Sequence, residues 1–300
     1  MDNKFNFSSK FRVANIFSLI LFVTSVLFIL FKGLNYGIDF KGGTLIELRA
    51  SSTGASEIRT ALNKMDLGDV NVKNFGQEGD YLIKVEQKEN DGNKIIPQIK
   101  ENLSENLKTE INFRRVENVG PKVSSELLQS GIIAISLSLA AMLFYIWIRF
   151  EWQFSIGSII ALFHDVVITL GIFSILSLEI NLSIIAAVLT IVGYSMNDTV
   201  VIYDRIRENL NKFNRLNIKE IADLSINDTL ARTIITSVTT LLALLSIFIL
   251  GGEILKGFSF AMILGVVIGT YSSIFVASPM LKFLKVTYKT LEKEEEKIIP

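Results

Sequence analysis

Long apolar stretches alternate with short polar connections over most of this 300-residue chain. Six of these stretches reach the roughly 17 to 25 residues that a membrane-spanning helix needs. They cover residues 13–31, 127–148, 154–178, 180–202, 233–250 and 257–281. The pattern therefore predicts an α-helical polytopic membrane protein with six transmembrane helices.

The first stretch follows the basic residues Lys4, Lys10 and Arg12 and contains no charge, as the apolar part of a signal peptide would. It is, however, longer than the usual apolar part of a signal peptide, and no small-x-small cleavage site follows it. We therefore expect an uncleaved membrane anchor, with a cleavable signal peptide as the alternative.

A longer polar insert, residues 32–126, separates the first two spans. Its pattern of polar and apolar residues is typical of a soluble domain. Alternating apolar positions predict strands, and apolar positions at helical spacing predict helices, the first of them capped by Ser56. The strands are predicted at residues 44–48, 70–75, 81–86 and 111–116, and the helices at 56–65 and 93–108. The order β-α-β-β-α-β is that of a small ferredoxin-like α+β domain. Because the insert carries no cofactor motif, we expect a binding or docking module.

Basic residues in the short connections predict the orientation of the helices, because cytoplasmic loops carry an excess of Lys and Arg. One set of connections contains Lys4, Lys10, Arg12, Arg149, Arg205, Arg207, Lys212, Arg215, Lys219, Arg232, Lys282, Lys285 and Lys289. The opposite short loops offer only Glu179, Glu253 and Lys256. We therefore expect both terminal segments, residues 1–12 and 282–300, to be cytoplasmic and the insert to be periplasmic.

The connection between the fourth and fifth spans, residues 203–232, mixes charges of both signs. Its apolar residues Ile206, Leu210 and Phe213 recur at helical spacing. This pattern favours an amphipathic helix at the membrane surface over a specific docking site.

The composition supports a membrane protein and reduces the number of functions to consider. Half of the residues are hydrophobic, 21 are Phe and only 4 are Pro, and the mean hydropathy is +0.44. The 30 basic and 30 acidic residues cancel, so there is no bulk attraction to nucleic acid. The chain has no Cys, no phosphate-binding glycine loop, no paired metal ligands and no nucleophile-His-acid constellation. We therefore expect neither an enzyme nor a metal or cofactor site.

An aspartate in the fourth span is the strongest indication of function. Asp198 lies at membrane depth, where an ionisable group costs about 3 kcal/mol on insertion scales and needs a partner or a water path. Arg232 opens the next span from the same side and is therefore a candidate ion-pair partner for proton movement. Ser195 lies one turn from Asp198 on the same helix face.

The fifth span carries a stripe of threonines on one helix face. It consists of Thr229, Thr233, Thr236 and Thr240. The stripe could extend a polar path from Arg232, but hydroxyl bonds to the helix backbone or to neighbouring helices explain it equally well. Both interpretations stay open.

The third span holds a second polar pair, His164 and Asp165. This is the only His of the chain, and His titrates close to neutral pH. The pair could relay protons or could clamp two helices together by hydrogen bonds, and the sequence favours neither. Gly265 and Gly269 in the sixth span predict close helix packing.

Several motifs resemble those of the SecD/SecF family of protein-export membrane proteins, which belongs to the resistance-nodulation-division superfamily. Residues 36–43, with the sequence Tyr-Gly-Ile-Asp-Phe-Lys-Gly-Gly, resemble the conserved segment after the first span of that family. Residues 193–208, from Gly-Tyr-Ser-Met-Asn-Asp onward, resemble the signature of its SecF branch. Residues 119–121, 164–166 and 231–237 also have counterparts there, so the motifs cover nearly the whole chain in order.

The resemblance implies an accessory subunit of the bacterial Sec translocase in the inner membrane. Such a subunit uses the proton-motive force to promote late steps of polypeptide export. The implied partners are SecD, SecYEG, the unfolded secretory polypeptide and the lipid bilayer. SecD would supply the other six-helix half and a matching acidic residue. YajC and YidC are further candidate partners.

The resemblance also implies roles for individual residues. It links proton movement to Asp198 and Arg232. The secondary relay candidates are His164, Asp165, Asn197 and Thr236. The junction motif between the first span and the periplasmic domain contains Gly37, Asp39, Gly42 and Gly43. Its glycines permit either plain tight turns or a hinge.

Two other classes of protein would carry similar features. A proton-coupled exporter of small molecules or lipids from the same superfamily should have a pocket or tunnel in its outer domain and should work without SecYEG. A structural scaffold of the translocase should keep secretion active when Asp198 is replaced by Asn.

Overall fold

The computed structural model describes residues 5–50, 53–65, 67, 70–74, 76–85, 92–107, 111–213 and 215–291. Parts of both predicted terminal segments, residues 1–4 and 292–300, lie outside this range. Phe75, Glu86 and Lys108, which were placed at the ends of predicted elements, lie outside it as well.

Six helices of the described part are long and apolar enough to span a membrane. They are α1 (Phe11–Phe31), α5 (Pro121–Arg149), α6 (Trp152–Ile175), α7 (Leu182–Lys212), α8 (Ile218–Leu250) and a last span that runs through α9 (Glu253–Ser272), the π-helical segment η1 (Ser273–Ala277) and α10 (Ser278–Phe283). The six-helix prediction is therefore confirmed.

The spanning helices divide into an inner and an outer group. In the most apolar part of α6, 61% of the residues are buried, and in α7 and the last span 50% are buried. The corresponding fractions are 11% for α1 and α5 and 17% for α8. Apolar side chains exposed to this extent are stable only against lipid or against another membrane subunit.

Small residues allow the helices to approach closely at three crossings. A Cβ atom at Gly265 would lie 2.2 Å from Cγ1 of Ile191, and one at Gly269 would lie 2.9 Å from Cβ of Ser195. At Gly171 of α6 the added atom would lie 2.2 Å from Cβ of Ser25 on α1. The predicted packing role of Gly265 and Gly269 is confirmed, because both glycines hold α9 against α7.

The insert forms a four-stranded sheet with two helices, which we call the sheet domain. Its elements are β2 (Gly43–Arg49), α3 (Ala55–Asn63), β3 (Val70–Asn74), β4 (Asp80–Val85), α4 (Gly92–Asn106) and β5 (Asn112–Val119). The strand order is β3-β4-β2-β5, and neighbouring strands are antiparallel. This is the arrangement of two interleaved split β-α-β units that the sequence predicted.

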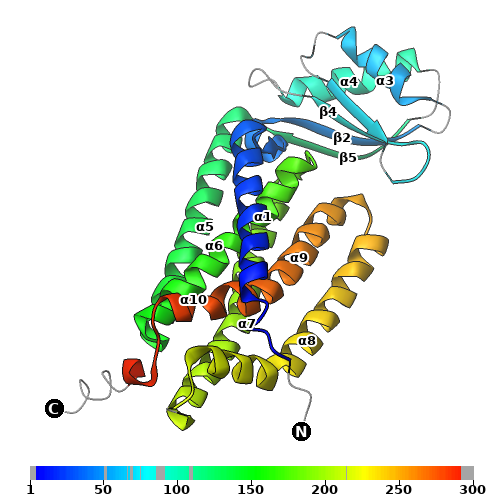
Figure 1. The fold of residues 1–300 in the computed structure, drawn as a ribbon. Coiled ribbons are helices and arrows are strands. Elements are labelled where there is room, and N and C mark those ends of the chain that lie inside the picture. Colours follow the sequence, from blue (N-terminus) through cyan, green and yellow to red (C-terminus); the bar gives the residue numbers. More distant parts are fainter. Residues whose placement is uncertain are drawn as a thin grey trace.

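The two faces of the sheet have different neighbours. Ile46 and Ile83 are opposite each other on β2 and β4 and are fully buried with residues of α3 and α4, such as Leu62 and Leu103. Figure 1 shows these helices on the side of the sheet away from the spanning bundle. Because side chains alternate along a strand, the intervening positions face the bundle.

The first helix of the sheet domain begins earlier than predicted. Gly54, not Ser56, is the N-cap of α3, and the carboxylate of Glu57 accepts a hydrogen bond from the Gly54 N–H at 3.4 Å. The Glu57 carboxylate thus satisfies the N–H of the N-cap residue, which is one of the two contacts of a capping box.

Two long helices contain most of residues 203–232, the segment that was predicted as an amphipathic connection at the membrane surface. α7 continues to Lys212, and α8 begins at Ile218 after Asn217, whose side chain accepts hydrogen bonds from two N–H groups of the first turn. Glu208 pairs with both Arg205 and Lys212 at helical spacing, at 2.5 Å in each case. These ion pairs stabilise the extension of α7 beyond the apolar stretch.

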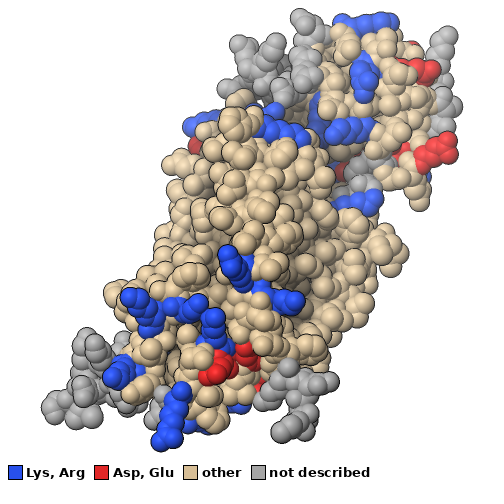
Figure 2. Space-filling view, viewed as in Figure 1, with Lys and Arg blue, Asp and Glu red and all other residues tan. Residues whose placement is uncertain are grey.

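The start of α1 and the helix α10 lie at the end of the bundle opposite the sheet domain (Figure 1). Figure 2 shows charged residues gathered toward the two ends of the molecule, with a broad band of uncharged residues between them. Such a band is what a bilayer requires of the surface that it covers. Which end faces the cytoplasm stays a prediction.

Candidate functional site

Asp165 of α6 is the centre of a buried hydrogen-bond cluster between three helices. Its side chain is fully buried, and its Oδ2 accepts hydrogen bonds from the hydroxyls of Ser195 on α7 at 2.6 Å and of Ser272 on α9 at 2.7 Å. The Nδ1 atom of His164 lies 2.9 Å from its other oxygen. The protein itself therefore satisfies both oxygens of this carboxyl group.

His164 completes the cluster on the side of α1. Its ring stacks nearly parallel to that of Phe22, with 6.5 Å between the ring centroids. Its Nε2 atom is buried and has no hydrogen-bond partner within the part of the chain that the structure describes. His164 and Asp165, the two candidate residues of the third span, thus belong to one cluster. Its hydrogen bonds connect α6 to α7 and α9, as expected if the pair holds helices together.

Asp198 of α7 has a much poorer set of partners. It is only 3% exposed, and the hydroxyl of Thr270 on α9 lies 3.4 Å from its Oδ2. That distance is long for a hydrogen bond between oxygen atoms. The Thr270 hydroxyl also shares a hydrogen bond of 2.7 Å with Ser237 on α8. One weak donor leaves this buried carboxyl group poorly satisfied.

Arg232 lies within electrostatic range of Asp198 but forms no ion pair with it in the described part of the chain. The guanidinium is instead on the exposed side of α8. Asn197 is also exposed, and Thr236 donates hydrogen bonds to the backbone oxygens of Arg232 and Thr233 rather than to Asp198. Within the described part of the chain, none of these three predicted residues therefore bonds to the carboxyl group of Asp198.

The π-helical segment η1 lies next to both aspartates along the last span. The hydroxyl of Ser273 is 2.8 Å from that of Thr199 on α7, and the buried hydroxyl of Tyr203 donates to the backbone oxygen of Ala277 at 2.9 Å. π-helical turns often occur at functional sites because they release backbone groups from the regular ladder. One sign of this region is visible in the sequence, where a polar run from Thr270 to Ser273 interrupts an apolar helix.

The junction motif forms a compact turn between the bundle and the sheet domain. Gly42 and Gly43 have φ angles of +80° and +143°, and a Cβ atom at Gly43 would lie 2.6 Å from the backbone oxygen of Val85. Only glycine fits such positions without strain. Gly37 donates a backbone hydrogen bond to Ile180 at 2.8 Å, where β1 (Asn35–Tyr36) pairs with β6 (Glu179–Ile180).

Asp39 connects the junction motif to the helix that carries Asp198. It lies in the short helix α2 (Ile38–Lys41), and its carboxylate accepts a hydrogen bond of 2.9 Å from the N–H of Leu182. Leu182 is the first residue of α7, so the negative charge also interacts favourably with the helix dipole. Asp39 was predicted as a motif residue, but its contact with α7 was not foreseen.

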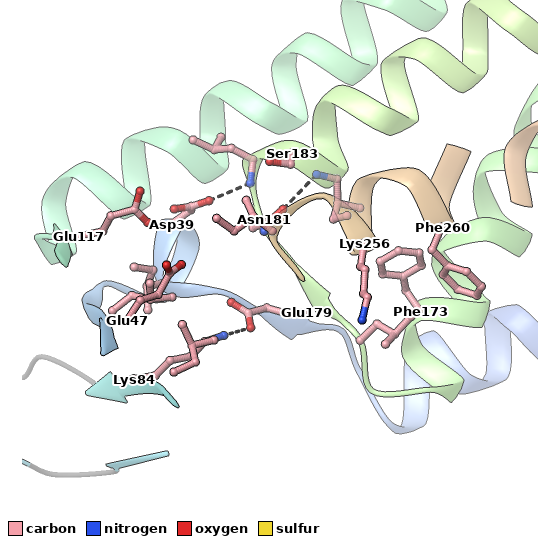
Figure 3. Close-up of a pocket in the computed structure, with 18 of the residues that line it drawn as sticks. Asp39, Glu47, Lys84, Glu117, Phe173, Glu179, Asn181, Ser183, Lys256 and Phe260 are labelled. Carbon is pink, nitrogen blue, oxygen red and sulfur yellow. Dashed lines mark hydrogen bonds and ion pairs between the residues drawn. The ribbon is translucent and has the colours of Figure 1, made fainter. Parts of the chain in front are cut away.

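An ion pair between Lys84 of β4 and Glu179 of β6 also ties the sheet domain to the bundle (Figure 3). Burial lowers the pKa of Lys84 to about 8, and repulsion from Lys73 acts in the same direction. The charge of Asp39 opposes this shift of the Lys84 pKa.

Comparison with known protein families matches two parts of the chain. Residues 99–287 match the family described as "Protein export membrane protein SecD/SecF, C-terminal". Residues 27–53, which include the junction motif, match the "SecD/SecF GG Motif".

Curated relatives are similar over nearly their whole length. The protein translocase subunit SecF of Rickettsia bellii is 47% identical over 279 residues, which cover 92% of both chains. The subunit of the same name from Vibrio alginolyticus is 44% identical over 275 residues, which cover 90% of this chain and 86% of the relative.

Solved structures share the fold. The crystal structure of SecDF, a translocon-associated membrane protein from Thermus thermophilus, superposes with a TM-score of 0.84 at 36% identity and covers 95% of this chain. The crystal structure of SecDF in a super-membrane-facing form has a TM-score of 0.71 at 34% identity. This chain spans 39% of the first SecDF chain and 40% of the second. By motif, sequence and fold, the chain belongs to the SecD/SecF family of protein-export membrane proteins, on its SecF branch.

Proposed function

We propose that this chain works with SecD as a subunit of the Sec translocase that uses the proton-motive force to promote late steps of polypeptide export. The observation that carries the proposal is Asp198, a buried carboxyl group at membrane depth with one weak donor. Such a group is costly to keep charged, and it therefore favours proton exchange over a purely structural role.

A second membrane subunit would complete the Asp198 site. This chain spans 39% of the SecDF chain from Thermus thermophilus, and its outer helices expose apolar surface. Arg232 and Asn197 are polar and exposed on helices that should lie in the membrane. A SecD chain packed on these faces would shield both groups and would supply the matching acidic residue.

Proton binding at Asp198 would act on the sheet domain through α7. This helix carries Asp198 in its middle, and its first residue is held by Asp39 of the junction motif. Moving one charge through about 100 mV releases about 2.3 kcal/mol. Shifting a two-state element from 1:99 to 99:1 takes about 5.5 kcal/mol. A single proton would thus bias the movement of α7 without fully determining it.

The proposal includes the setting of the protein. The sheet domain lies in the periplasm and both termini in the cytoplasm of a bacterium, as the distribution of basic residues predicts. The remaining partners are SecYEG and the secretory polypeptide, with YajC and YidC as further candidates, and the protein is not an enzyme.

The test is polypeptide secretion by vesicles that contain this chain, SecD and SecYEG, with and without a proton gradient. Asp198→Asn should remove the stimulation by the gradient, because the amide cannot carry a proton. Asp204→Asn is the matched control, since Asp204 lies on the same helix but pairs with Arg149 at the exposed end of the bundle.

Three outcomes separate the alternatives. Stimulation of Asp198→Asn to the native level would refute the proton-carrier role. Secretion that needs the chain but not Asp198 would indicate a scaffold. Gradient-driven transport of small molecules by vesicles without SecYEG would indicate an exporter.

A further inference from the structure

A small cavity of about 170 Å³ lies where the junction motif meets the sheet domain. Its walls come from β1, α2 and β6 on the side of the bundle and from β3 and β4 on the side of the sheet. Sites for drug-sized ligands occupy about 300 to 1,000 Å³. This cavity therefore has room for a small chemical group rather than for a large ligand.

Three lysines from separate elements line the cavity, which we call the lysine pocket. They are Lys41 at the end of α2, Lys73 of β3 and Lys84 of β4. Asn71 of β3 is directly opposite Lys84, and Lys73 follows Asn71 by two residues. Because side chains alternate along a strand, these three sheet residues share one face, on which the two lysines repel each other. Burial and this repulsion both lower the pKa of Lys84.

The acidic groups of this region do not balance the lysines. Glu179 is the one acidic side chain among the described residues that line the pocket, and it pairs with Lys84. Asp39 lies close enough to act on the charge of Lys84, but its carboxylate accepts the hydrogen bond from Leu182. Lys73 has no hydrogen bond or ion pair with a described residue. Even with both acids counted, three cations face two anions, so the pocket attracts a further negative charge.

The chemistry of the pocket fits a phosphate group. Phosphate is a frequent partner of lysine, and its oxygens accept charge-assisted hydrogen bonds from ammonium groups. It carries more acceptor oxygens than a carboxylate does, so lysines from separate elements can share it. The side-chain amide of Asn71, which also lines the pocket, would add a neutral donor beside the two sheet lysines.

We propose that the lysine pocket binds a phosphate group, supplied either by the headgroup of an anionic phospholipid or by free phosphate. A lipid can reach the pocket, because Asn35 lines it four residues after the spanning helix α1 ends at Phe31. The bound phosphate would join α2 to β3 and β4 and would thereby hold the sheet domain against the bundle. This inference does not depend on the proton-carrier role of Asp198.

The experiment measures how fast an acylating reagent modifies individual lysines of the chain in complex with SecD. One sample uses vesicles of digalactosyl diacylglycerol, a bilayer lipid without phosphate. A second sample adds phosphatidylglycerol to these vesicles, and a third adds inorganic phosphate at constant ionic strength. A bound phosphate keeps an ammonium group protonated and so protects it from acylation.

Protection of Lys73 by phosphatidylglycerol alone would identify a lipid headgroup as the ligand, and protection by inorganic phosphate would identify the free anion. Lys32 is the control for the general effect of a charged membrane surface, because it lies at the end of α1 but does not line the pocket. Protection at Lys73 should exceed that at Lys32 by about tenfold, the effect of one charge-assisted hydrogen bond.

Two variants test whether the lysines act together. Lys41→Gln should raise the concentration of the phosphate source needed for half-maximal protection of Lys73 by about tenfold, because one of three cations is lost. Lys64→Gln is the matched control, since Lys64 is exposed at the end of α3 and does not line the pocket, and it should change nothing. Protection at Lys73 no greater than at Lys32 in either sample, or the same half-maximal concentration in Lys41→Gln, would overturn the proposal.

Discussion

The two aspartates buried in the bundle differ in how completely their own chain surrounds them. Asp165 accepts two short hydroxyl hydrogen bonds and lies beside His164, and the contacts come from α6, α7 and α9. Among the described residues, the carboxyl group of Asp198 has a single long hydrogen bond, from Thr270 at 3.4 Å. A carboxyl group whose hydrogen bonds are all made is costly to rearrange. One that lacks hydrogen-bond donors gains more from binding a proton or from contact with a partner subunit.

This difference suggests that the two aspartates have different roles, one in stability and one in export. The Asp165 cluster ties the three inner helices together and fixes the distances between them. Asp198 lies beside the same helices but at a site that lacks donors. We therefore expect substitutions at Asp165 to affect mainly stability and substitutions at Asp198 to affect mainly export.

The largest effect on stability is expected for Asp165→Ala. It leaves the buried hydroxyl of Ser195 without its acceptor, and the hydroxyl of Ser272 keeps only the backbone oxygen of Gly269 at 3.1 Å. Each buried group left unsatisfied costs about 1 to 3 kcal/mol, and the lost side chain also leaves a cavity, so the free energy of unfolding should fall by about 3 to 5 kcal/mol. Unfolding in mixed micelles measures it. A loss below about 1 kcal/mol would mean that the cluster does not clamp the helices.

The next largest effect is expected for Gly269→Ala, because the new methyl group would lie 2.9 Å from Cβ of Ser195. Displacing α9 from α7 should cost about 1 to 3 kcal/mol. Gly193→Ala on α7 is the matched control, since nothing lies within 4 Å of its added Cβ. That change should stabilise the helix by about 0.5 to 1 kcal/mol. Equal effects of the two changes would contradict the packing described here.

In contrast to these losses of stability, Asp198→Asn should not lower the free energy of unfolding. The amide removes a buried ionisable group that has one weak donor, so the free energy of unfolding should stay the same or rise by about 1 kcal/mol. The same mixed-micelle experiment measures it beside Asp165→Ala. If the two variants were destabilised equally, the comparison between the aspartates would fail.

The last expected effect is a pH dependence that lies outside the membrane, at Lys84. Its pKa is about 8 in the folded protein, against an ordinary value of 10.5, because burial disfavours the charged form. Between these two values the unfolded chain binds more protons than the folded chain, so stability should increase with pH by at most about 1.4 kcal/mol per unit.

Lys84→Met should abolish this part of the pH dependence. Unfolding measured at pH 7, 8 and 9 in both proteins tests it, and the difference between the two proteins cancels the other titrating groups. A difference that does not change with pH would show that Lys84 keeps its ordinary pKa.

The sequence was sufficient for the architecture, because the length of an apolar stretch and the alternation along a strand depend on local order alone. It was less informative where residues far apart in the chain meet. Ser195 was assigned to the face of Asp198, but its hydroxyl points to Asp165 on another helix. The helix spacing permits both directions, and only the packing of α6 and α9 selects one.

Contacts between distant residues, or beyond the apolar stretches, also explain the other features that the sequence did not predict. The contact of Asp39 with Leu182 joins residues 143 positions apart. The division of residues 203–232 between α7 and α8 depends on the ion pairs of Glu208 and the cap at Asn217, which extend each helix past its apolar part. A prediction from hydropathy alone ends each helix at the last residue of its apolar stretch.

The most direct test of the difference between the aspartates is to observe their protons. Infrared difference spectra of the complex with SecD in vesicles, recorded while the external pH is changed, report carboxyl groups that gain or lose a proton. A carboxyl band should disappear in Asp198→Asn and persist in Asp165→Asn. A band that persists in Asp198→Asn, or that is lost only in Asp165→Asn, would contradict the account.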